Sequence, residues 1–244
     1  MTLSQVMTPA EVGLSTLENL AECPALNAWM YQTIRPYVKG RVLEIGSGIG
    51  NISEQFVKDG YPITVSDYSL DYCRALEKRF GYESLVEDVV HLDLADKDLE
   101  AHHPELLGTF NTLFALNVVE HIELDGLAIS NCRKLLAKQG NVVILVPSYP
   151  GLYNILDEKL EHFRRYTTES MRMLLSPDFK VTTTFHFNLA AIPGWFWAGS
   201  VLKKPTLPAG PLKWYNRLVP LFKFMDELTF HQAGVSVIGV GQRR

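Results

Sequence analysis

The stretch Arg41-Val-Leu-Glu-Ile-Gly-Ser-Gly-Ile-Gly-Asn-Ile-Ser53 decides the fold of this chain. Residues 42–45 form a short apolar run rich in β-branched side chains, which is typical of a buried parallel strand. Three glycines follow at alternate positions, and apolar residues then recur at helical spacing (Ile52, Phe56). The pattern predicts a strand, a tight glycine-rich turn and a helix. Glycine lets a ligand approach bare backbone, and the N–H groups that open the helix would point at that ligand.

Composition and charge narrow the class of protein. The 244 residues are enough for one α/β domain with an elaboration. A hydrophobic content of 47% and a net charge of −4 describe an ordinary globular protein without a basic field for nucleic acid. Three separate cysteines, with no Cys-x-x-Cys pair, argue against a disulfide scaffold or a zinc cluster and favour the cytoplasm. We expect no signal peptide and no transmembrane segment.

Two acidic residues accompany the glycine-rich turn. Glu44 lies two residues before the first glycine, and Asp67 follows the next apolar run, residues 61–65. A carboxylate at the end of a second parallel strand suits hydrogen bonding to ribose hydroxyls. The Gly-x-Gly-x-Gly spacing differs from the Gly-x-Gly-x-x-Gly of dinucleotide dehydrogenases. These residues together resemble the cofactor signature of the class I methyltransferases, which use S-adenosylmethionine (SAM). The alternative is a strand–helix turn that binds no ligand.

Two later segments extend the resemblance. The family places an acid against the adenine amino group after its third strand. Asp93 fits this position best, and Asp88 is the rival candidate. The alternative is that both are loop carboxylates that contact only solvent. Residues 110–121 resemble the family's Phe-Asp-x-Val … Asn-Val-x-Glu-His signature, and Asn-Val-Val-Glu-His at 117–121 matches its second part. The one departure is Asn111, which stands where the family usually has Asp. The resemblance implies that SAM contacts Glu44, Gly46, Ser47, Gly48, Gly50, Asn51, Asp67, Tyr68, Asp93, Leu94 and Asn117.

The resemblance also implies the fold class, an α/β protein with a seven-stranded, mostly parallel Rossmann-like sheet and helices on both faces. We expect one methyltransferase domain over 1–244, with an N-terminal helical cap (1–40), a SAM-binding core (41–187), a lid or insertion (188–232) and a last, antiparallel strand (233–244). The N-terminal helices either cap the cofactor or simply pack on the sheet. Periodicity predicts helices over 51–60, 69–80, 123–138 and 167–175, and strands over 61–66, 83–91, 110–116, 141–146, 179–187 and 235–240.

His121 is the first candidate for a general base, because it follows a strand that ends beside the expected methyl donor. Its alternative role is that of a satisfied histidine that orients the loop. Some related methyltransferases bind a divalent ion through a Glu-x-x-Glu-His arrangement. Here Asn117 replaces the first of those glutamates, so we predict no metal.

Residues 161–166, Glu-His-Phe-Arg-Arg-Tyr, resemble the His-x-Arg-Arg-Tyr loop of one branch of these methyltransferases. We expect this loop to roof the acceptor site, with His162 and Tyr166 orienting or deprotonating the acceptor. Arg164 and Arg165 either grip a carboxylate or phosphate or pair with Asp157, Glu158 or Glu161 and pin the loop. The expected acceptor contacts are Tyr149, Tyr153, Arg164, Arg165, Trp195 and Trp197.

The segment 188–232 is rich in aromatic residues and prolines and exceeds the minimal fold. We expect one of four roles for this segment. It is a lid for an apolar, lipid-like or isoprenoid-like acceptor, or a peripheral membrane contact through Trp195–Trp197 and Lys203-Lys204. The other two roles are a dimer interface and a satellite core that covers the edge of the sheet. The chain would accordingly be a monomer or a homodimer.

The function predicted from these residues is transfer of a methyl group from SAM to an oxygen, nitrogen or carbon of a small-molecule or lipid-like acceptor, with S-adenosylhomocysteine as the product. The alternatives are a non-catalytic SAM-binding subunit and a nucleotide-dependent oxidoreductase.

Overall fold

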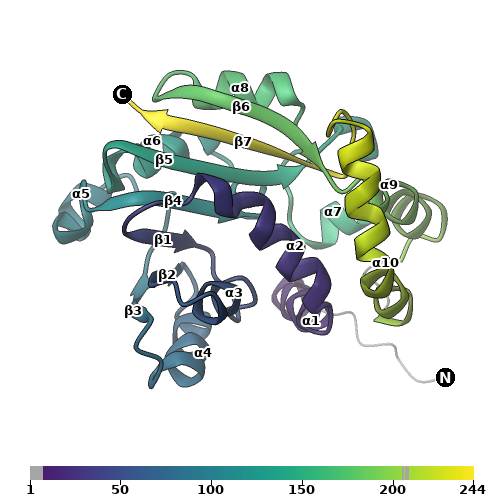
Figure 1. Ribbon diagram of the computed structural model, residues 1–244, viewed down its shortest axis with the longest axis horizontal. Coiled ribbons are helices and arrows are strands. Elements are labelled where there is room, and N and C mark those ends of the chain that lie inside the picture. The colour runs from purple at the N-terminus through teal and green to yellow at the C-terminus, as the bar shows by residue number, and fades with distance from the viewer. Residues whose placement is uncertain (1–7, 205, 207–208) are drawn as a thin grey trace.

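One sheet organises the part of the chain that the computed structural model describes, residues 8–204, 206 and 209–244 (Figure 1). Its strand order is β3-β2-β1-β4-β5-β7-β6, and β7 runs antiparallel to both of its neighbours. This arrangement confirms the predicted fold class, including the antiparallel last strand. The strands are β1 (Val42–Ile45), β2 (Ile63–Asp67), β3 (Val86–His91), β4 (Phe110–Leu116), β5 (Leu136–Pro147), β6 (Phe179–Phe187) and β7 (Ser236–Arg243).

Helices connect and cover the strands. The α-helices are α1 (Pro9–Ala21), α2 (Pro24–Ile34), α3 (Ser53–Lys58), α4 (Leu70–Phe80), α5 (Leu99–His102), α6 (Asp125–Leu135), α7 (Ile155–Lys159), α8 (Thr168–Leu175), α9 (Ala191–Trp195) and α10 (Ala209–Leu228). Shorter turns are η1 (Arg35–Tyr37), η2 (Pro104–Leu106), η3 (Val119–His121), η4 (Pro150–Leu152) and the π-helical η5 (Phe196–Val201). None of the helices in the described residues combines the length and the apolar character needed to cross a bilayer.

Successive residues of the central strands point to opposite faces of the sheet and so build two cores. Leu113 of β4 packs with Ile129 of α6 and Met171 of α8 on one face. Phe114, the next residue, belongs to the core of α2, α3 and α4 on the other face, where its ring stacks on Phe56 with centroids 5.2 Å apart. Both faces of the sheet are therefore covered, as the long apolar strands require.

Polar contacts hold the segment between β6 and β7 together and attach it to α2. Asp226 of α10 is fully buried, and its carboxylate accepts hydrogen bonds from the backbone N–H groups of Asn188 (2.6 Å) and Leu189 (2.9 Å). Asn216 Oδ1 accepts from the N–H groups of Ala25 (2.9 Å) and Leu26 (3.2 Å). Asn216 thus caps the N-terminus of α2, which lies beside α10 in Figure 1.

Several expected boundaries differ from the structure. The helix expected over 51–60 begins only at Ser53, because residues 49–52 still belong to the turn. The helix expected over 123–138 ends at Leu135, and β5 starts at Leu136, which adopts an extended conformation and pairs with Phe110. The segment between β5 and α8 contains helix α7, whose first turn is capped by Asn154.

Candidate functional site

The glycine turn follows β1 at the carboxyl edge of the parallel strands, where open α/β sheets bind their ligands. Gly46 has a φ of +68°, and a Cβ atom added there would lie 2.4 Å from Val118 Cγ2. Glycine is therefore required at this position both by the backbone conformation and by the close approach of the segment after β4. The turn and the segment 117–121 consequently form one packed unit.

Asp67 lies at the end of β2, directly beside the turn. Its Oδ2 atom accepts a hydrogen bond from Gly48 N (2.9 Å) and its Oδ1 atom accepts from Ser69 N (2.9 Å). The residue is 3% exposed, and this burial raises the pKa of its carboxyl group. Each carboxylate oxygen can accept a second hydrogen bond, so Asp67 keeps acceptor capacity for ligand hydroxyls.

Glu44 lies beneath the turn, which corrects the expectation that it faces the cofactor. Its side chain is buried and accepts a hydrogen bond from Ser53 Oγ at the start of α3. Burial raises the pKa of Glu44 to about 7. Ser47 is also directed inward, because its N–H donates to Ser66 O (2.9 Å) and its Oγ accepts from Ser66 N (3.2 Å). Both residues hold the turn against β2 and α3.

Helix α1 lies over the turn, and α2 packs on the sheet. Leu17 contacts Gly48 closely enough that a Cβ atom there would lie 2.9 Å from Leu17 Cδ1. Asn51 Nδ2 donates to Leu17 O (2.9 Å) and links the turn to α1. The apolar spacing of α1 in the sequence was the available signal for this contact.

The edge beyond β3 carries Asp93, whose Oδ1 accepts from Ala95 N (2.8 Å) in an exposed turn. The neighbouring backbone is joined to the Asp67 region, because Leu92 N donates to Asp67 O (2.9 Å). The side chain of Leu94 is only 2% exposed and belongs to the hydrophobic core, so it does not lie on the surface that a ring would contact. The exposed Tyr68 lies beside Asp67 at this edge.

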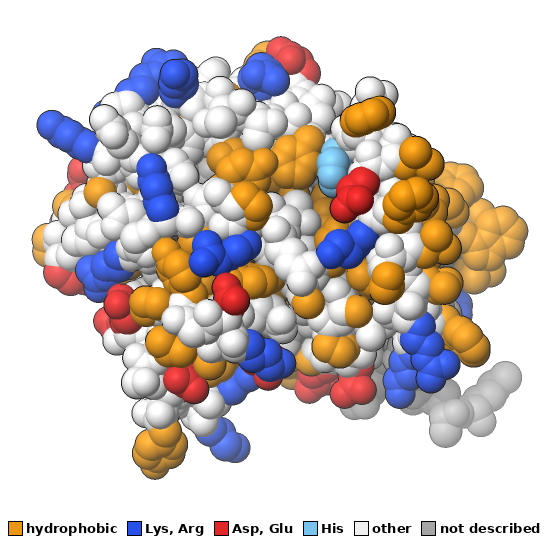
Figure 2. Space-filling model, viewed as in Figure 1, with side chains coloured by type: hydrophobic (Ala, Val, Ile, Leu, Met, Phe, Trp, Pro, Cys, Tyr) orange, Lys and Arg blue, Asp and Glu red, His pale blue; other side chains and the backbone are white. Residues whose placement is uncertain are grey.

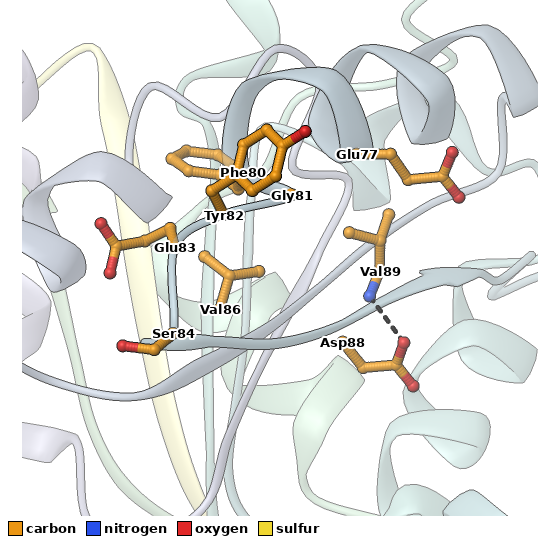
Figure 3. A pocket seen from close by; sticks show the side chains of 9 residues that line it. All are labelled: Glu77, Phe80, Gly81, Tyr82, Glu83, Ser84, Val86, Asp88 and Val89. Atoms are coloured by element: carbon orange, nitrogen blue, oxygen red, sulfur yellow. Dashed lines mark hydrogen bonds between the residues drawn. The ribbon is translucent and has the colours of Figure 1, made fainter.

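Asp88, the rival of Asp93, lies elsewhere. It faces an open hollow of about 460 Å³ on the outer edge of the sheet, lined by the end of α4 and by β3 (Figure 3). Within the sheet Asp88 pairs with Thr64, whereas Asp67 pairs with His91 at the carboxyl end. The structure therefore separates Asp88 from the glycine turn and favours Asp93.

The segment after β4 brings polar groups to the same edge. Asn117 is exposed and has a φ of +56°, a conformation that asparagine tolerates better than most residues. Glu120 is completely buried, and burial raises the pKa of its carboxyl group to about 8. His121 keeps solvent-exposed surface, yet its ring packs edge-on against His162, with centroids 4.6 Å apart. Crowding by protein atoms and the nearby imidazole lower the pKa of His121.

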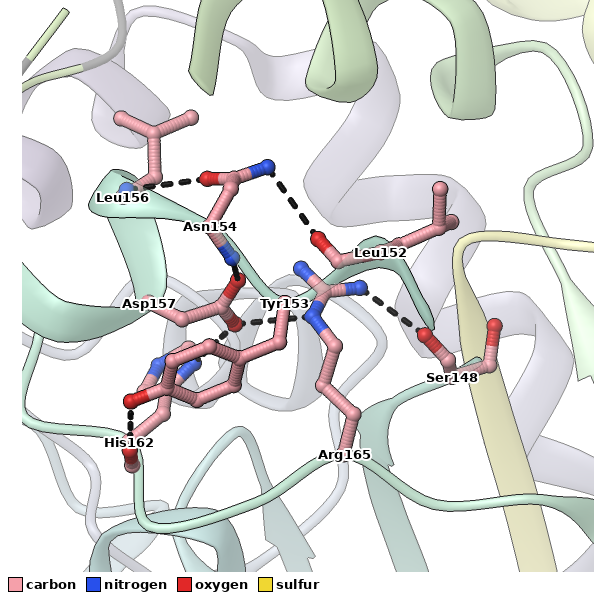
Figure 4. Close-up of polar contacts among 8 residues, drawn as sticks. All are labelled: Ser148, Leu152, Tyr153, Asn154, Leu156, Asp157, His162 and Arg165. Atoms are coloured by element: carbon pink, nitrogen blue, oxygen red, sulfur yellow. Dashed lines mark hydrogen bonds and ion pairs between the residues drawn. The ribbon is translucent and has the colours of Figure 1, made fainter. Parts of the chain in front are cut away.

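His162 and Arg165 converge on Asp157 in the loop after β5 (Figure 4). His162 Nδ1 and Arg165 Nε both lie 2.8 Å from Asp157 Oδ1, and Asn154 N donates to Asp157 Oδ2 (3.0 Å). Arg165 Nη1 also donates to Ser148 O (2.9 Å). All of these groups are buried, so the network fixes the loop and the ring of His162.

Both arginines pair with acids, Arg165 with one of the expected acids of its own loop and Arg164 with Asp125 of α6, which was not among the acids expected. The Arg165 side chain is fully buried on Asp157, with its guanidinium 4.6 Å from the centre of the Trp195 ring. Arg164 pairs with Asp125 (2.8 Å) and donates to Glu123 O (2.7 Å). In the described structure both guanidinium groups are therefore engaged by protein atoms rather than presented to an acceptor.

Tyr166 also faces the protein interior, which corrects its expected catalytic position. The residue is 3% exposed, and its hydroxyl donates to Asp125 Oδ2 (2.9 Å). Burial and the neighbouring Asp125 carboxylate raise the pKa of the phenol. A phenol held in this way is a poor base at neutral pH.

The expected acceptor contacts divide into two groups. Tyr149 stacks on His186 with ring centroids 4.9 Å apart, and Tyr153 donates through its hydroxyl to His162 O (2.8 Å). Both therefore belong to the loop after β5 and are held by contacts with protein groups. Trp195 lies beneath Arg165, whereas Trp197 is 59% exposed. Trp195 therefore contacts Arg165 of the loop, whereas Trp197 faces solvent.

Sequence reasoning did not assign Glu120, Asp157 or Asp125 a place in the site. Glu120 was visible as the neighbour of His121, but only its complete burial marks it as unusual. Asp157 was named only as one of several acids that might pair with an arginine, and its choice among them depends on the turn of α7.

Comparison with known proteins agrees with this geometry. Residues 43–142 match the sequence model of a methyltransferase domain. Among curated proteins, no sequence matches the chain. A SAM-dependent methyltransferase from Archaeoglobus fulgidus is 18% identical, with a TM-score of 0.59 over 90% of this chain and 94% of that chain.

Two further solved structures are similar at comparable levels. Phosphoethanolamine N-methyltransferase 2 of Haemonchus contortus in complex with SAM is 15% identical, with a TM-score of 0.57 over 88% of this chain and 52% of that chain. The [4+2]-cyclase SpnF is 13% identical, with a TM-score of 0.59 over 88% of this chain and 80% of that chain. The chain therefore has the fold of the SAM-dependent methyltransferases, with a methyltransferase domain match over residues 43–142.

Proposed function

We propose that this protein transfers a methyl group from SAM to a lipid-like acceptor. The observation that carries the proposal is the juxtaposition of the glycine turn with the buried Asp67 carboxylate at adjacent strand ends. The methyltransferase domain match covers both features. Assignment to the branch with the His-x-Arg-Arg-Tyr loop stays a prediction.

The residues at this edge suit the parts of SAM. The remaining acceptor capacity of Asp67 suits ribose hydroxyls, Asp93 suits the adenine amino group, and the bare backbone at Gly46 to Gly48 permits close approach. SAM supplies an electrophilic methyl group that an acceptor attacks in line. Because Leu17 occupies the space against Gly48, we expect α1 to shift when the cofactor binds.

Helix α10, which carries apolar residues on two faces, supports the choice of a lipid-like acceptor. Tyr215, Val219 and Phe222 pack inward beside α2. On the opposite face the exposed side chains follow helical spacing and form what we call the outer stripe: Trp214, Leu218, Leu221, Phe224 and Leu228. Figure 2 shows apolar side chains gathered on this side of the molecule. An exposed apolar patch of this extent marks an interaction surface.

Charge favours a bilayer as the partner of the outer stripe. Lys213 and Arg217 are exposed on α10 itself, as is the acidic Glu227, and Lys203 and Lys204 are exposed in the segment before α10, whereas Asp226 is buried. Apolar side chains framed by basic residues are typical of helices that lie in the surface of an anionic membrane. Docking there would present the site to acceptors dissolved in the bilayer.

Titration calorimetry with SAM and with NADH tests the donor. We expect SAM to bind and NADH not to bind; the reverse result would support the oxidoreductase alternative. Turnover of methyl-labelled SAM with a lipid extract then separates an enzyme from a non-catalytic SAM-binding subunit. This second assay is needed because the [4+2]-cyclase SpnF has the same fold, and a fold does not fix the reaction.

Co-sedimentation with phosphatidylglycerol vesicles tests the bilayer. We expect the protein to bind, and the double substitution Trp214→Ala and Leu218→Ala to reduce binding at least tenfold. Tyr82→Ala is the matched control, because Tyr82 is a fully exposed aromatic residue at the opposite end of the sheet. Equal binding by both variants would contradict membrane docking through the outer stripe.

A further inference from the structure

Three groups that commonly ligate metals meet beside the expected methyl donor. Glu120 and His121 belong to η3, and His162 comes from the loop after β5. One ligand atom from each residue can be chosen so that all three lie within 4.8 Å of one another. We propose that Glu120, His121 and His162 bind a first-row divalent cation such as Zn²⁺ or Co²⁺. This reverses the prediction of no metal, which considered residues 117–121 alone.

The strongest evidence is Glu120. Its side chain is fully buried, and neither carboxylate oxygen has a hydrogen-bond partner among the described residues. Leaving a buried polar group without a partner costs about 1–3 kcal/mol, and more when the group is charged. Such a residue in a folded protein requires an explanation, and a bound cation provides one.

His162 is oriented as a ligand would be. Its Nδ1 atom is engaged by Asp157 (2.8 Å), so Nε2 is the ring nitrogen that would bind a cation. Asp157 is itself held by Arg165 and by the N–H of Asn154. Histidines that bind metals typically have their second nitrogen engaged by a carboxylate or carbonyl in this manner, because the contact fixes the tautomer and the ring.

The main chain brings the two segments together. Phe163 N donates to Glu120 O (2.8 Å), so the residue after His162 is hydrogen-bonded directly to η3. The His121 ring then lies edge-on to the His162 ring, with centroids 4.6 Å apart. Because His121 retains exposed surface, this side of the site stays open for a fourth ligand.

The spacing suits a site that contracts on binding. Zinc bonds to histidine nitrogen and carboxylate oxygen are about 2.0–2.2 Å long, so neighbouring ligand atoms in a tetrahedral site lie roughly 3.3 Å apart. Reaching that separation requires rotation of side chains, and His121 is the one of the three residues that keeps exposed surface. Two imidazoles and one carboxylate with an open position favour zinc or a neighbouring transition metal over Mg²⁺.

The role that we give this cation rests on the proposed methyl transfer, although the binding site itself does not. A cation with an open position binds an acceptor oxygen and lowers the pKa of its hydroxyl. The proton leaves to solvent, the oxygen forms a bond to the methyl carbon, and the electrons of the C–S bond go to sulfur. The acceptor would then be an oxygen nucleophile.

Cobalt titration of the EDTA-treated, dialysed protein tests the site without any turnover. We expect one equivalent of Co²⁺ to produce visible d–d absorption, and Zn²⁺ to displace it. Glu120→Gln, His121→Ala and His162→Ala should each lower Co²⁺ affinity at least tenfold. Asp157→Asn should lower it about 10- to 100-fold, because the loss of the charged partner weakens the ligand it orients.

His102→Ala is the matched control, because His102 is an exposed histidine that also contacts a carboxylate, Asp96, elsewhere on the surface. Circular dichroism establishes that each variant is folded; His121→Ala is the least disruptive of the three, since His121 is at the surface. Failure of the wild-type protein to bind Co²⁺, or unchanged binding in Glu120→Gln and His121→Ala, would overturn the proposal. The orphaned Nη2 of Arg165 would then be the natural partner of Glu120.

SAM calorimetry in the presence of EDTA keeps the two proposals apart. If SAM binds but Co²⁺ does not, only the metal site is lost. If Co²⁺ binds through the three residues and SAM does not, the metal site stands and the methyl-transfer function is lost.

Discussion

Replacing Gly46 by alanine tests the packed unit formed by the glycine turn and the segment after β4. Gly46 has a φ of +68°, and the new Cβ atom would lie 2.4 Å from Val118 Cγ2. Gly60 is the matched control, because its φ of +70° is nearly the same while no described atom lies within 4 Å of the Cβ position. The pair separates backbone strain from steric overlap.

The magnitudes follow from these two contributions. A left-handed conformation costs a non-glycine residue about 1–2 kcal/mol, and the lower entropy of unfolded alanine offsets about 0.4–1 kcal/mol of that cost. Gly60→Ala should therefore lower the free energy of unfolding by about 1 kcal/mol or less. Overpacking against Val118 adds about 1–3 kcal/mol, so Gly46→Ala should lose about 3 kcal/mol in total. For a chain of this length that loss corresponds to about 6–12 °C in Tm.

A double-mutant cycle in urea identifies the cause of the loss. Val118→Ala alone should destabilise by about 1 kcal/mol, since it removes two half-buried methyl groups. In the double variant, Gly46→Ala with Val118→Ala, the overlap disappears, and we expect about 1–2 kcal/mol less destabilisation than the sum of the single changes. Strict additivity, or equal losses in Gly46→Ala and Gly60→Ala, would refute the reasoning. SAM calorimetry on the folded variants then reports whether the turn has moved.

Three further changes probe other contacts. Asp67→Ala should raise the Kd for SAM at least tenfold in calorimetry, whereas the distant carboxylate variant Asp88→Ala should leave the Kd unchanged. Burial raises the pKa of Glu44 to about 7, so the folded protein binds the extra proton and should lose stability as pH rises from about 4.5 to about 7. Glu44→Gln should flatten this part of the stability profile in urea unfolding, and parallel profiles would contradict the assignment. Asn216→Ala should lower the free energy of unfolding by about 1 kcal/mol through loss of the α2 cap, with Asn216→Asp retaining most of it; equal losses in both variants would rule out a capping role.

The fold was readable from the sequence because its signals are local. The apolar runs predicted β4 over 110–116 and β6 over 179–187 with the bounds that the structure has. The glycine turn and Asp67 were placed correctly, since the carboxyl ends of adjacent parallel strands must meet at one edge. Element ends were less accurate at Ser53 and Leu135, where the length of the glycine turn and the strand pairing of Leu136 set the helix bounds.

Side-chain direction could not be read in the same way. The sequence placed Tyr166 and Arg165 in the right loop, but their hydroxyl and guanidinium groups turn inward to Asp125 and Asp157. A motif fixes which residues share a segment, whereas the partner of a buried polar group is chosen by the packing around it.

By itself, therefore, the sequence determined the sheet, the turn and the cofactor edge, because periodicity and turn chemistry act over a few residues. Only the tertiary structure decided which distant residues meet. It brings His162 against Glu120 and His121, and Asn216 onto the start of α2. It also leaves one apolar face of α10 exposed, although both faces look alike in the sequence. Such contacts join segments tens to hundreds of residues apart, and the physical reason that they form is the burial of surfaces that no local pattern specifies.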